Sequence, residues 1–390
     1  MPLPQPLRTI IALGVTQIVG YGTLYYAFGV MALQLTADLG VSLPFAYGAF
    51  SLALLAGGAL APLVGRAIDR HGARPVMAAG SAAAALALLV LSQATGAVSL
   101  VAALVLVEMV SAAVLYDAAF AALAQAAGAA GARRAITLMT LMGGFASTVF
   151  WPLTLVLMEG LGWRGTYLIF AGLHLLICLP LHLTLARQDS QSTGTASTTP
   201  SAGLLPLAQQ GRAMFWLAIG FSLAGVVLGA LTVQWVPLLQ ATGLSAAAAV
   251  TAGALLGPAQ VGVRIIDLFF GVRRHPMTMA LVSAGLLVTS LGLLIVMPTG
   301  LVGAMLFACV FGLSSGLTSI VRGTVPLALF GATGYAARLG VLAGLRLASS
   351  ALAPFALALA LTHLGAGLTI SLTFGVALAA FLALTQVPRG

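Results

Sequence analysis

The sequence predicts an all-α membrane protein with about twelve transmembrane helices. Hydrophobic residues make up 61% of the 390 residues and charged residues only 6%, and the mean hydropathy is +1.12. A soluble domain cannot bury this much apolar surface, whereas a lipid bilayer can cover it. Because one crossing takes about 20 residues, a chain of this length with short loops accommodates roughly twelve crossings.

Apolar runs separated by short polar or Gly/Pro-containing breaks mark the individual helices. We expect them at 9–35, 45–66, 75–95, 98–125, 136–158, 165–186, 213–240, 246–268, 276–297, 300–321, 336–361 and 367–386. Four of the prolines inside these spans are expected to remove backbone hydrogen bonds where a rocking transporter could use the break. They are Pro152, Pro237, Pro258 and Pro354.

A polar stretch, Q-D-S-Q-S-T-G-T-A-S-T-T-P-S, interrupts the apolar pattern near the middle of the chain. It predicts a flexible cytoplasmic linker over 187–212 between two six-helix bundles, 1–186 and 213–390. A weak internal repeat supports this division, because P-L-V-G-R-A-I-D-R from Pro62 and P-A-Q-V-G-V-R-I-I-D from Pro258 both place an Arg three residues before an Asp. The two bundles are expected to be related by a pseudo-twofold axis along the membrane normal.

The distribution of arginines predicts the orientation in the membrane. With the N-terminus in the cytoplasm, Arg8, Arg133 and Arg212 lie near the inner interface and Arg164 lies outside. We therefore expect an integral protein of a bacterial inner membrane with both termini cytoplasmic. The first apolar helix has no charged segment and cleavage site before it, so it is expected to be retained as the first span. Since the arginines are spread over successive loops, no nucleic-acid partner is expected.

The stretch from Leu63 to Val76, L-V-G-R-A-I-D-R-H-G-A-R-P-V, concentrates charge between two apolar runs. Its glycines allow close backbone approach and a tight turn, and Asp69 is placed to accept hydrogen bonds at a helix end. The order G-R-x-x-D-R-x-G-x-R resembles the signature loop between helices 2 and 3 of the major facilitator superfamily. The matching positions are Gly65, Asp69, Arg70, Gly72 and Arg74.

The resemblance implies a major facilitator fold and a cytoplasmic conformational latch, in which the charged side chains hold helix ends in one state and release them in another. Arg66 and Asp267, from the two copies of the internal repeat, are assigned to the same latch. The arginines also serve as positive-inside topology signals, and both interpretations hold together.

The stretches F-G-V-M-A-L-Q-L and L-G-W-R-G-T-Y are similar to the oxalate/formate and monocarboxylate transporter branch of this superfamily. In that branch, basic residues of helices 8 and 11 bind substrate carboxylates, which implies such roles for Arg264 and Arg346. The acidic residue that often opens helix 1 in the branch is missing here, where the chain reads G-Y-G-T-L-Y-Y.

The position of Arg346 is a second reason to expect that it binds substrate. It lies about ten residues, or about 15 Å, into its predicted span, which is near the midplane. A guanidinium at that depth binds a carboxylate through two parallel hydrogen bonds, and Ser349 and Ser350 flank it. The alternative is a structural ion pair with an acid on a neighbouring helix. Arg264 has two interpretations, a pocket residue or a latch residue with Asp267.

Two acidic residues occupy the fourth predicted span. Glu108 lies near the midplane, where a carboxyl group is a candidate for proton coupling or for the counter-ion of Arg346. Asp117 is nine residues further on, about half a turn out of phase, so the two acids do not share a helix face. We expect Asp117 at an inner gate with an arginine, or as a second proton carrier if the protein is an exporter.

Tyr21, Tyr25 and Gln17 form a row at spacings of four residues in the first predicted span. We expect this row to line a substrate pocket. The alternative is that these side chains only hydrogen-bond to a neighbouring helix.

No catalytic, metal or cofactor site is predicted. The histidines and the two cysteines lack metal-ligand spacing, and a phosphate-binding P-loop motif is absent, so neither enzymatic activity nor ATP-driven transport is indicated.

These features favour transport of a small organic anion, with a carboxylate as the expected substrate, by a monomer that works through alternating access and is coupled to protons or to a counter-substrate. The alternatives are proton-coupled efflux of lipophilic compounds and a membrane sensor that does not transport.

Overall fold

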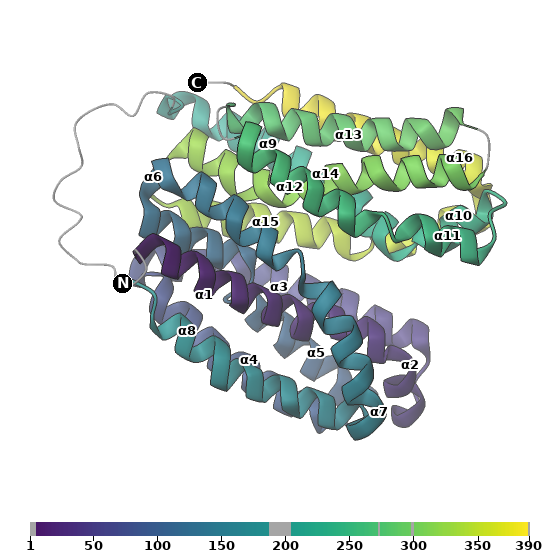
Figure 1. Cartoon of the computed structure of the whole chain (residues 1–390), viewed down its shortest axis with the longest axis horizontal. Helices are drawn as coiled ribbons and strands as arrows, with labels where there is room; N and C mark the ends of the chain where they lie inside the picture. Colours follow the sequence, from purple (N-terminus) through teal and green to yellow (C-terminus); the bar gives the residue numbers. More distant parts are fainter. Residues whose placement is uncertain (1–4, 187–203, 272–273, 298–299, 389–390) are drawn as a thin grey trace. The chain divides into compact units, whose positions relative to one another are not determined.

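The computed structural model describes residues 5–186, 204–271, 274–297 and 300–388, and all regular structure in these ranges is helical (Figure 1). The first part contains α1 (Gln5–Gly20), the π-helical η1 (Tyr21–Tyr26), α2 (Ala27–Leu39), α3 (Leu43–His71), α4 (Ala73–Ser92), α5 (Ala97–Ser111), α6 (Tyr116–Gly143), α7 (Ala146–Leu173), the π-helical η2 (His174–Cys178) and α8 (Leu179–Leu183). The second part contains α9 (Leu207–Val233), α10 (Trp235–Ala241), α11 (Ala246–Gly253), α12 (Leu256–Phe270), α13 (Pro276–Val296), α14 (Leu301–Phe330), α15 (Tyr335–Ala351) and α16 (Ala353–Thr385).

Ten helical segments of the described chain are long and apolar enough to cross a membrane. Two of them, Gly131–Leu183 and Tyr335–Thr385, are 53 and 51 residues long, which is enough for two crossings each. A glycine in the left-handed region interrupts each long segment, Gly162 at φ 66° and Gly365 at φ 75°. The described helices are therefore consistent with the predicted twelve crossings.

The internal contacts divide the chain into two compact units. Unit 1 comprises residues 1–202 and 331–344, and unit 2 comprises 203–330 and 345–390. In unit 1, α3 packs with α5, α1 with α6 and α4 with α7. In unit 2, α13 packs with α14 and with α16, α9 with α16, and α12 with α14.

The start of α15 groups with unit 1, whereas the sequence assigned it to the 213–390 bundle. Glycines explain this placement. A Cβ atom on Gly340 would overlap the carbonyl oxygen of Ala61, and one on Gly344 would lie 2.6 Å from that of Gly58, so only glycine allows α15 to approach α3 this closely.

The predicted linker needs a correction at its C-terminal end. Residues 187–203 of the predicted 187–212 segment lie outside the described residues, but α9 already begins at Leu207, directly after Pro206. The first turn of α9 is polar, with Gln209 and Gln210, so hydropathy alone placed the helix start several residues too late.

Of the four prolines singled out in the sequence, three lie in the first turn of a new helix. Pro237 is the third residue of α10, Pro258 the third of α12 and Pro354 the second of α16. The missing N–H of proline costs little there, because the first N–H groups of a helix have no partner within it. Spans predicted as continuous at 213–240, 246–268 and 336–361 are consequently broken just before these prolines. Pro152 instead lies inside α7, ten residues before the interruption at Gly162.

Candidate functional site

The turn between α3 and α4 has the geometry that its glycine predicts. Gly72, at φ 86°, ends α3 and starts α4 in a single residue. Gln125 of α6 fastens both helix ends, because its Oε1 accepts from the N–H of Ala73 at 2.9 Å and its Nε2 donates to the carbonyl of Ile68 at 3.4 Å. Sequence analysis missed Gln125, since it lies far along the chain with no recognisable motif around it.

Asp69 binds the first turn of α15. Its carboxylate accepts hydrogen bonds from the backbone N–H groups of Ala336 at 3.1 Å and Ala337 at 2.8 Å. The first N–H groups of a helix have no intrahelical partner, and the positive end of the helix dipole favours an anion there. Gly65, one turn earlier, makes this possible, because a Cβ on it would overlap the carbonyl oxygen of Ala336.

The basic residues of the signature loop are more open to solvent. Arg66 and Arg70 are exposed and Arg74 is half-buried. Of the predicted latch residues in this loop, Asp69 and Gly65 contact the start of α15, and Gly72 forms the turn between α3 and α4.

The fourth predicted span, 98–125, is broken in the structure, whereas the sequence predicted it as continuous. It divides into α5 and α6, with residues 112–115 between them. Gln17 of α1 satisfies one of the backbone groups freed by this break, because its Nε2 donates to the carbonyl oxygen of Val114 at 2.8 Å. Gln17 is fully buried, so it supports the break from within the helix packing.

Glu108 lies one turn before this break and is 4% exposed. The hydroxyl of Ser111 donates to its Oε2 at 3.1 Å, and its Oε1 has no hydrogen-bond partner among the described residues. Gly57 of α3 packs directly on the backbone of Glu108, since a Cβ there would lie 2.6 Å from the Glu108 carbonyl oxygen. A buried carboxyl group in which only one oxygen accepts a hydrogen bond is chemically suited to bind and release a proton.

Of the predicted row, Tyr21 and Tyr25 lie on the π-helical η1 and Gln17 lies on α1. The ring centroids of Tyr21 and Tyr116 are 4.5 Å apart, and Tyr116 is the first residue of α6, directly after the break between α5 and α6. Tyr25 is 37% exposed. Single π turns inside α-helices occur often at functional sites. Neither the π turn nor the role of Tyr116 was predicted, because both depend on contacts between distant segments.

Arg346 lies in the part of α15 that belongs to unit 2. Its aliphatic stem packs against Gly225 of α9, where a Cβ would lie 2.7 Å from the Arg346 Cγ and 2.9 Å from the Ser350 Oγ. Ser350 follows Arg346 by one helical turn, and its buried Oγ has no hydrogen-bond partner among the described residues. Ser349 is exposed and donates to the carbonyl of Leu345 at 2.8 Å, so it does not share this arrangement.

Arg264 and Asp267 lie three residues apart on α12 and are 4% and 2% exposed. A Cβ on Gly271 would overlap the Asp267 carboxylate, so that glycine makes room for the acid. The second copy of the repeat therefore has its charged residues buried, unlike the exposed Arg66 of the first copy. Asp117, on the first turn of α6, is half-buried and lies within electrostatic range of Tyr335.

Two histidines join helices inside unit 1. The Nε2 of His174 lies 2.8 Å from the Thr23 hydroxyl, and His182 bridges Ser81 at 2.7 Å and Thr16 at 3.1 Å. Both histidines are buried. The described residues contain no group of His, Cys, Asp and Glu side chains that could hold a metal ion.

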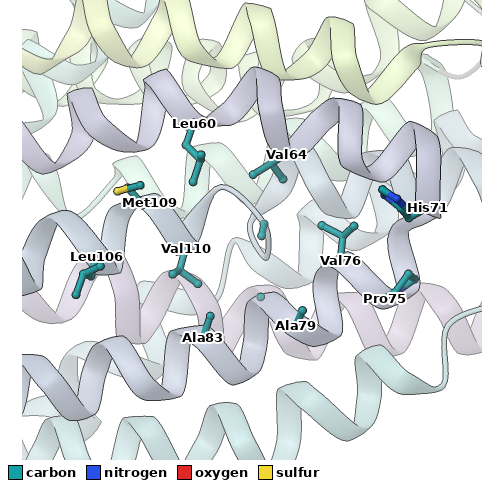
Figure 2. Close-up of a pocket in the computed structure, with 12 residues that line it drawn as sticks. Leu60, Val64, His71, Pro75, Val76, Ala79, Ala83, Leu106, Met109 and Val110 are labelled. Atoms are coloured by element: carbon teal, nitrogen blue, oxygen red, sulfur yellow. The ribbon is translucent and has the colours of Figure 1, made fainter.

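A groove of about 800 Å³ lies on unit 1 between α3, α4 and α5 (Figure 2). Its lining is apolar except for His71, and it includes none of the residues predicted to bind substrate. Leu60 and Val64 of α3 and Leu106 and Val110 of α5 are among its lining residues, and Leu106 lies at the opposite end from His71. This groove suits an acyl chain better than an organic anion, because it offers almost no hydrogen-bond donors.

Comparison with known families decides the class of this protein. The Major Facilitator Superfamily model matches residues 13–354, most of the chain. The chain belongs to the major facilitator superfamily. Membership identifies a membrane transporter and confirms the predicted fold. Comparison with curated proteins gave no match.

A solved structure shows the same architecture. The crystal structure of the human organic anion transporter MFSD10 (TETRAN) matches with a TM-score of 0.76 and 15% sequence identity, covering 98% of this chain and 100% of that chain. At this identity the similarity establishes the fold.

Proposed function

We propose that this major facilitator protein transports a small organic anion, with a carboxylate as the substrate class. The observation that carries the proposal is the arrangement of Arg346 and Ser350 on one face of α15 over the bare backbone of Gly225. The guanidinium presents parallel N–H donors that match the two oxygens of a carboxylate, and the Ser350 hydroxyl adds a further donor on the same face.

Charge in a membrane span is costly and is retained mainly where it acts on a substrate, an ion or a partner. Arg346 is a charged residue within Tyr335–Thr385, a segment that is apolar enough to cross a membrane. The human protein with the same fold is described as an organic anion transporter, which agrees in substrate class. The similarity of F-G-V-M-A-L-Q-L and L-G-W-R-G-T-Y to the oxalate/formate and monocarboxylate branch points to the same class.

Glu108 is the proposed coupling group. Its carboxyl is buried, and only one of its oxygens accepts a hydrogen bond within the described residues. Proton loading at this group would remove a buried charge, which supports symport of a proton with the anion. Exchange of one anion for another remains the alternative coupling mode, and substitution of Glu108 separates the two.

The contact of Asp69 with α15 is the proposed latch. Two charge-assisted hydrogen bonds hold the first turn of α15 against α3, and release of these bonds would free that helix end during alternating access. The exposed Arg66 and Arg70 contribute positive charge at the same membrane face.

A ligand screen on the detergent-purified protein tests the proposal. Acetate, oxalate and benzoate are compared with the lipophilic cation tetraphenylphosphonium by thermal unfolding, because a ligand that binds the folded state raises the unfolding temperature. We expect at least one carboxylate to stabilise the wild type and to fail on Arg346→Ala, while Arg346→Lys retains part of the effect.

Arg212→Ala, an exposed arginine of the same unit, is the matched control and should respond as the wild type does. Stabilisation by the cation alone, unchanged in Arg346→Ala, would overturn the anion assignment in favour of efflux of lipophilic compounds.

A further inference from the structure

The proposed transport function does not use the groove between α3, α4 and α5. Its volume of about 800 Å³ is in the range of small-molecule sites. All of its lining residues belong to unit 1, and neither Arg346 nor Glu108 is among them. The groove is therefore a second candidate binding site, separate from the proposed substrate site.

Small side chains of α4 give the groove its depth. Ala79, Gly80 and Ala83 line it on this helix, and both alanines are exposed. At Gly80 the helices close together, because a Cβ on that residue would lie 2.9 Å from the Cβ of Ala113. Bulkier lining residues of α3 and α5, such as Leu60 and Leu106, stand on either side. The result is an open apolar channel above a helix of small residues.

The groove has the length of one acyl chain in one leaflet. On α3 its lining residues run from Leu60 to His71, which is eleven residues or about 16 Å at the helical rise. Half of the hydrocarbon core of a bilayer is about 15 Å thick. The lining part of α3 lies within Leu43–His71, a segment that is apolar enough to cross a membrane. The groove thus extends from the end of this segment to about the bilayer midplane.

Positive charge gathers at one end of the groove. His71 lines that end, with Arg70 directly before it and Arg74 three residues after it (Figure 2). Neither arginine forms an ion pair with another described residue. The acid of this turn, Asp69, accepts hydrogen bonds from the first turn of α15. The turn therefore offers cationic groups to an anion at the end of an apolar channel.

The imidazole of His71 is oriented for a polar headgroup. Its Nδ1 lies 3.1 Å from the carbonyl oxygen of Ala67, and since a carbonyl only accepts, Nδ1 carries the proton of this hydrogen bond. The other ring nitrogen, Nε2, accepts from a headgroup hydroxyl when the ring is neutral and donates to a phosphate when it is protonated.

We propose that this groove binds an acidic phospholipid, with one acyl chain along α4 and the phosphate at the turn beside Arg70, His71 and Arg74. The separation of one charged end from a long apolar lining matches the separation of headgroup and chain in a lipid. Basic side chains at the membrane surface favour acidic lipids over zwitterionic ones. A lipophilic cation would fit the apolar part and be repelled by the arginines. The proposal does not depend on the identity of the substrate.

Photocross-linking of the full-length chain in phosphatidylcholine vesicles tests this proposal. Two probes carry the same diazirine-bearing acyl chain, one on phosphatidylglycerol and the other on phosphatidylcholine, and peptide mass spectrometry locates the label. We expect label on the groove-lining parts of α3 and α5. The phosphatidylglycerol probe should label them at least about fivefold more strongly, which is the effect of one arginine near an acidic lipid.

Substitution of the arginines tests headgroup recognition. Arg70→Gln/Arg74→Gln should bring the preference for phosphatidylglycerol toward one and leave labelling by phosphatidylcholine unchanged. Arg212→Gln, an exposed arginine of unit 2, is the matched control and should keep the wild-type preference. Equal labelling by the two probes in the wild type would overturn the acidic-lipid assignment.

Filling the groove tests the site of the acyl chain. Ala79→Leu/Ala83→Leu should reduce groove labelling by both probes, whereas Ala82→Leu, at an exposed position of α4 outside the lining, should not. Ala83→Leu alone is the milder variant and should lower labelling in the same direction if the double variant does not fold. Unchanged labelling in the folded filled variants would overturn the proposal.

Competition identifies the occupant. Unlabelled phosphatidylglycerol should displace the probe from the groove, and tetraphenylphosphonium should not. Displacement by the cation and not by the acidic lipid would overturn the proposal and assign the groove to lipophilic cations.

Discussion

The two copies of the internal repeat carry the same charge spacing and have different surroundings. In the first copy Arg66 is exposed and Asp69 binds the backbone N–H groups of α15. In the second copy Arg264 and Asp267 are both buried. An Arg three residues before an Asp therefore places opposite charges on one helix face in both cases, without deciding what those charges contact.

The glycine that follows accounts for part of the difference. Gly72 adopts a φ of 86° and ends α3 directly after the charged turn, so Asp69 stands at a helix end. Gly271 has a helical φ of −73° and continues the backbone geometry of α12. Its missing side chain instead makes room for the Asp267 carboxylate. One glycine provides a turn and the other provides space.

The largest expected effect on the free energy of unfolding comes from a substitution in the second copy of the repeat. Asp267→Ala removes the acid and leaves the buried Arg264 guanidinium without the opposite charge one turn away, which should reduce the free energy of unfolding by about 3–5 kcal/mol. Thermal unfolding in detergent, followed by circular dichroism of the helices, measures the loss.

The double variant Arg264→Leu/Asp267→Leu is the control for this experiment. Replacing both charges with apolar groups should restore much of the stability, because neither charge then remains buried alone. A double variant as unstable as the single one would show that the two side chains do not depend on each other.

A smaller effect is expected in the first copy. Asp69→Ala removes two charge-assisted hydrogen bonds at the start of α15 and should cost about 2 kcal/mol locally. Opening of that helix end can be followed at Ala337→Cys, in a background with Cys178→Ala and Cys309→Ala, by its rate of reaction with a maleimide.

The reaction rate at that cysteine should rise in Asp69→Ala and rise less in Asp69→Asn, since the amide oxygen still accepts a hydrogen bond. Equal rates in the wild type and both variants would mean that these hydrogen bonds do not hold the helix end.

The smallest effect on stability is expected for Arg66, the arginine of the first copy, in contrast to the buried Arg264 of the second copy. Arg66→Gln changes an exposed side chain and should alter the free energy of unfolding by no more than about 0.5 kcal/mol. The same thermal unfolding assay applies. A loss as large as that of Asp267→Ala would contradict the contrast between the two copies.

Local chemistry explains which features were predictable. Residue types close together in the chain show where the apolar runs on either side of Gly72 end and begin. They also give the signature spacing around Asp69. The candidate role of Glu108 also follows from composition alone, because few acids occur within the apolar runs. These properties do not require knowledge of the partner segment.

Features that depend on distant segments were not predictable. The break between α5 and α6 is supported by Gln17, which lies 97 residues before Val114, whose carbonyl group it satisfies. The π turn lies where Tyr21 packs against Tyr116, and this contact joins segments that are far apart in the sequence. Hydropathy also misplaced the start of α9, where the first turn is polar.

By itself the sequence determined that this is an all-helical membrane protein of the major facilitator superfamily, because hydropathy, arginine distribution and turn glycines act over a few residues each. The tertiary structure alone decided that Arg264 is buried while Arg66 is exposed, that α15 begins in unit 1, and that aromatic residues from four helices meet. Burial and side-chain contact depend on which helices pack together, and a single segment of sequence does not contain its partner.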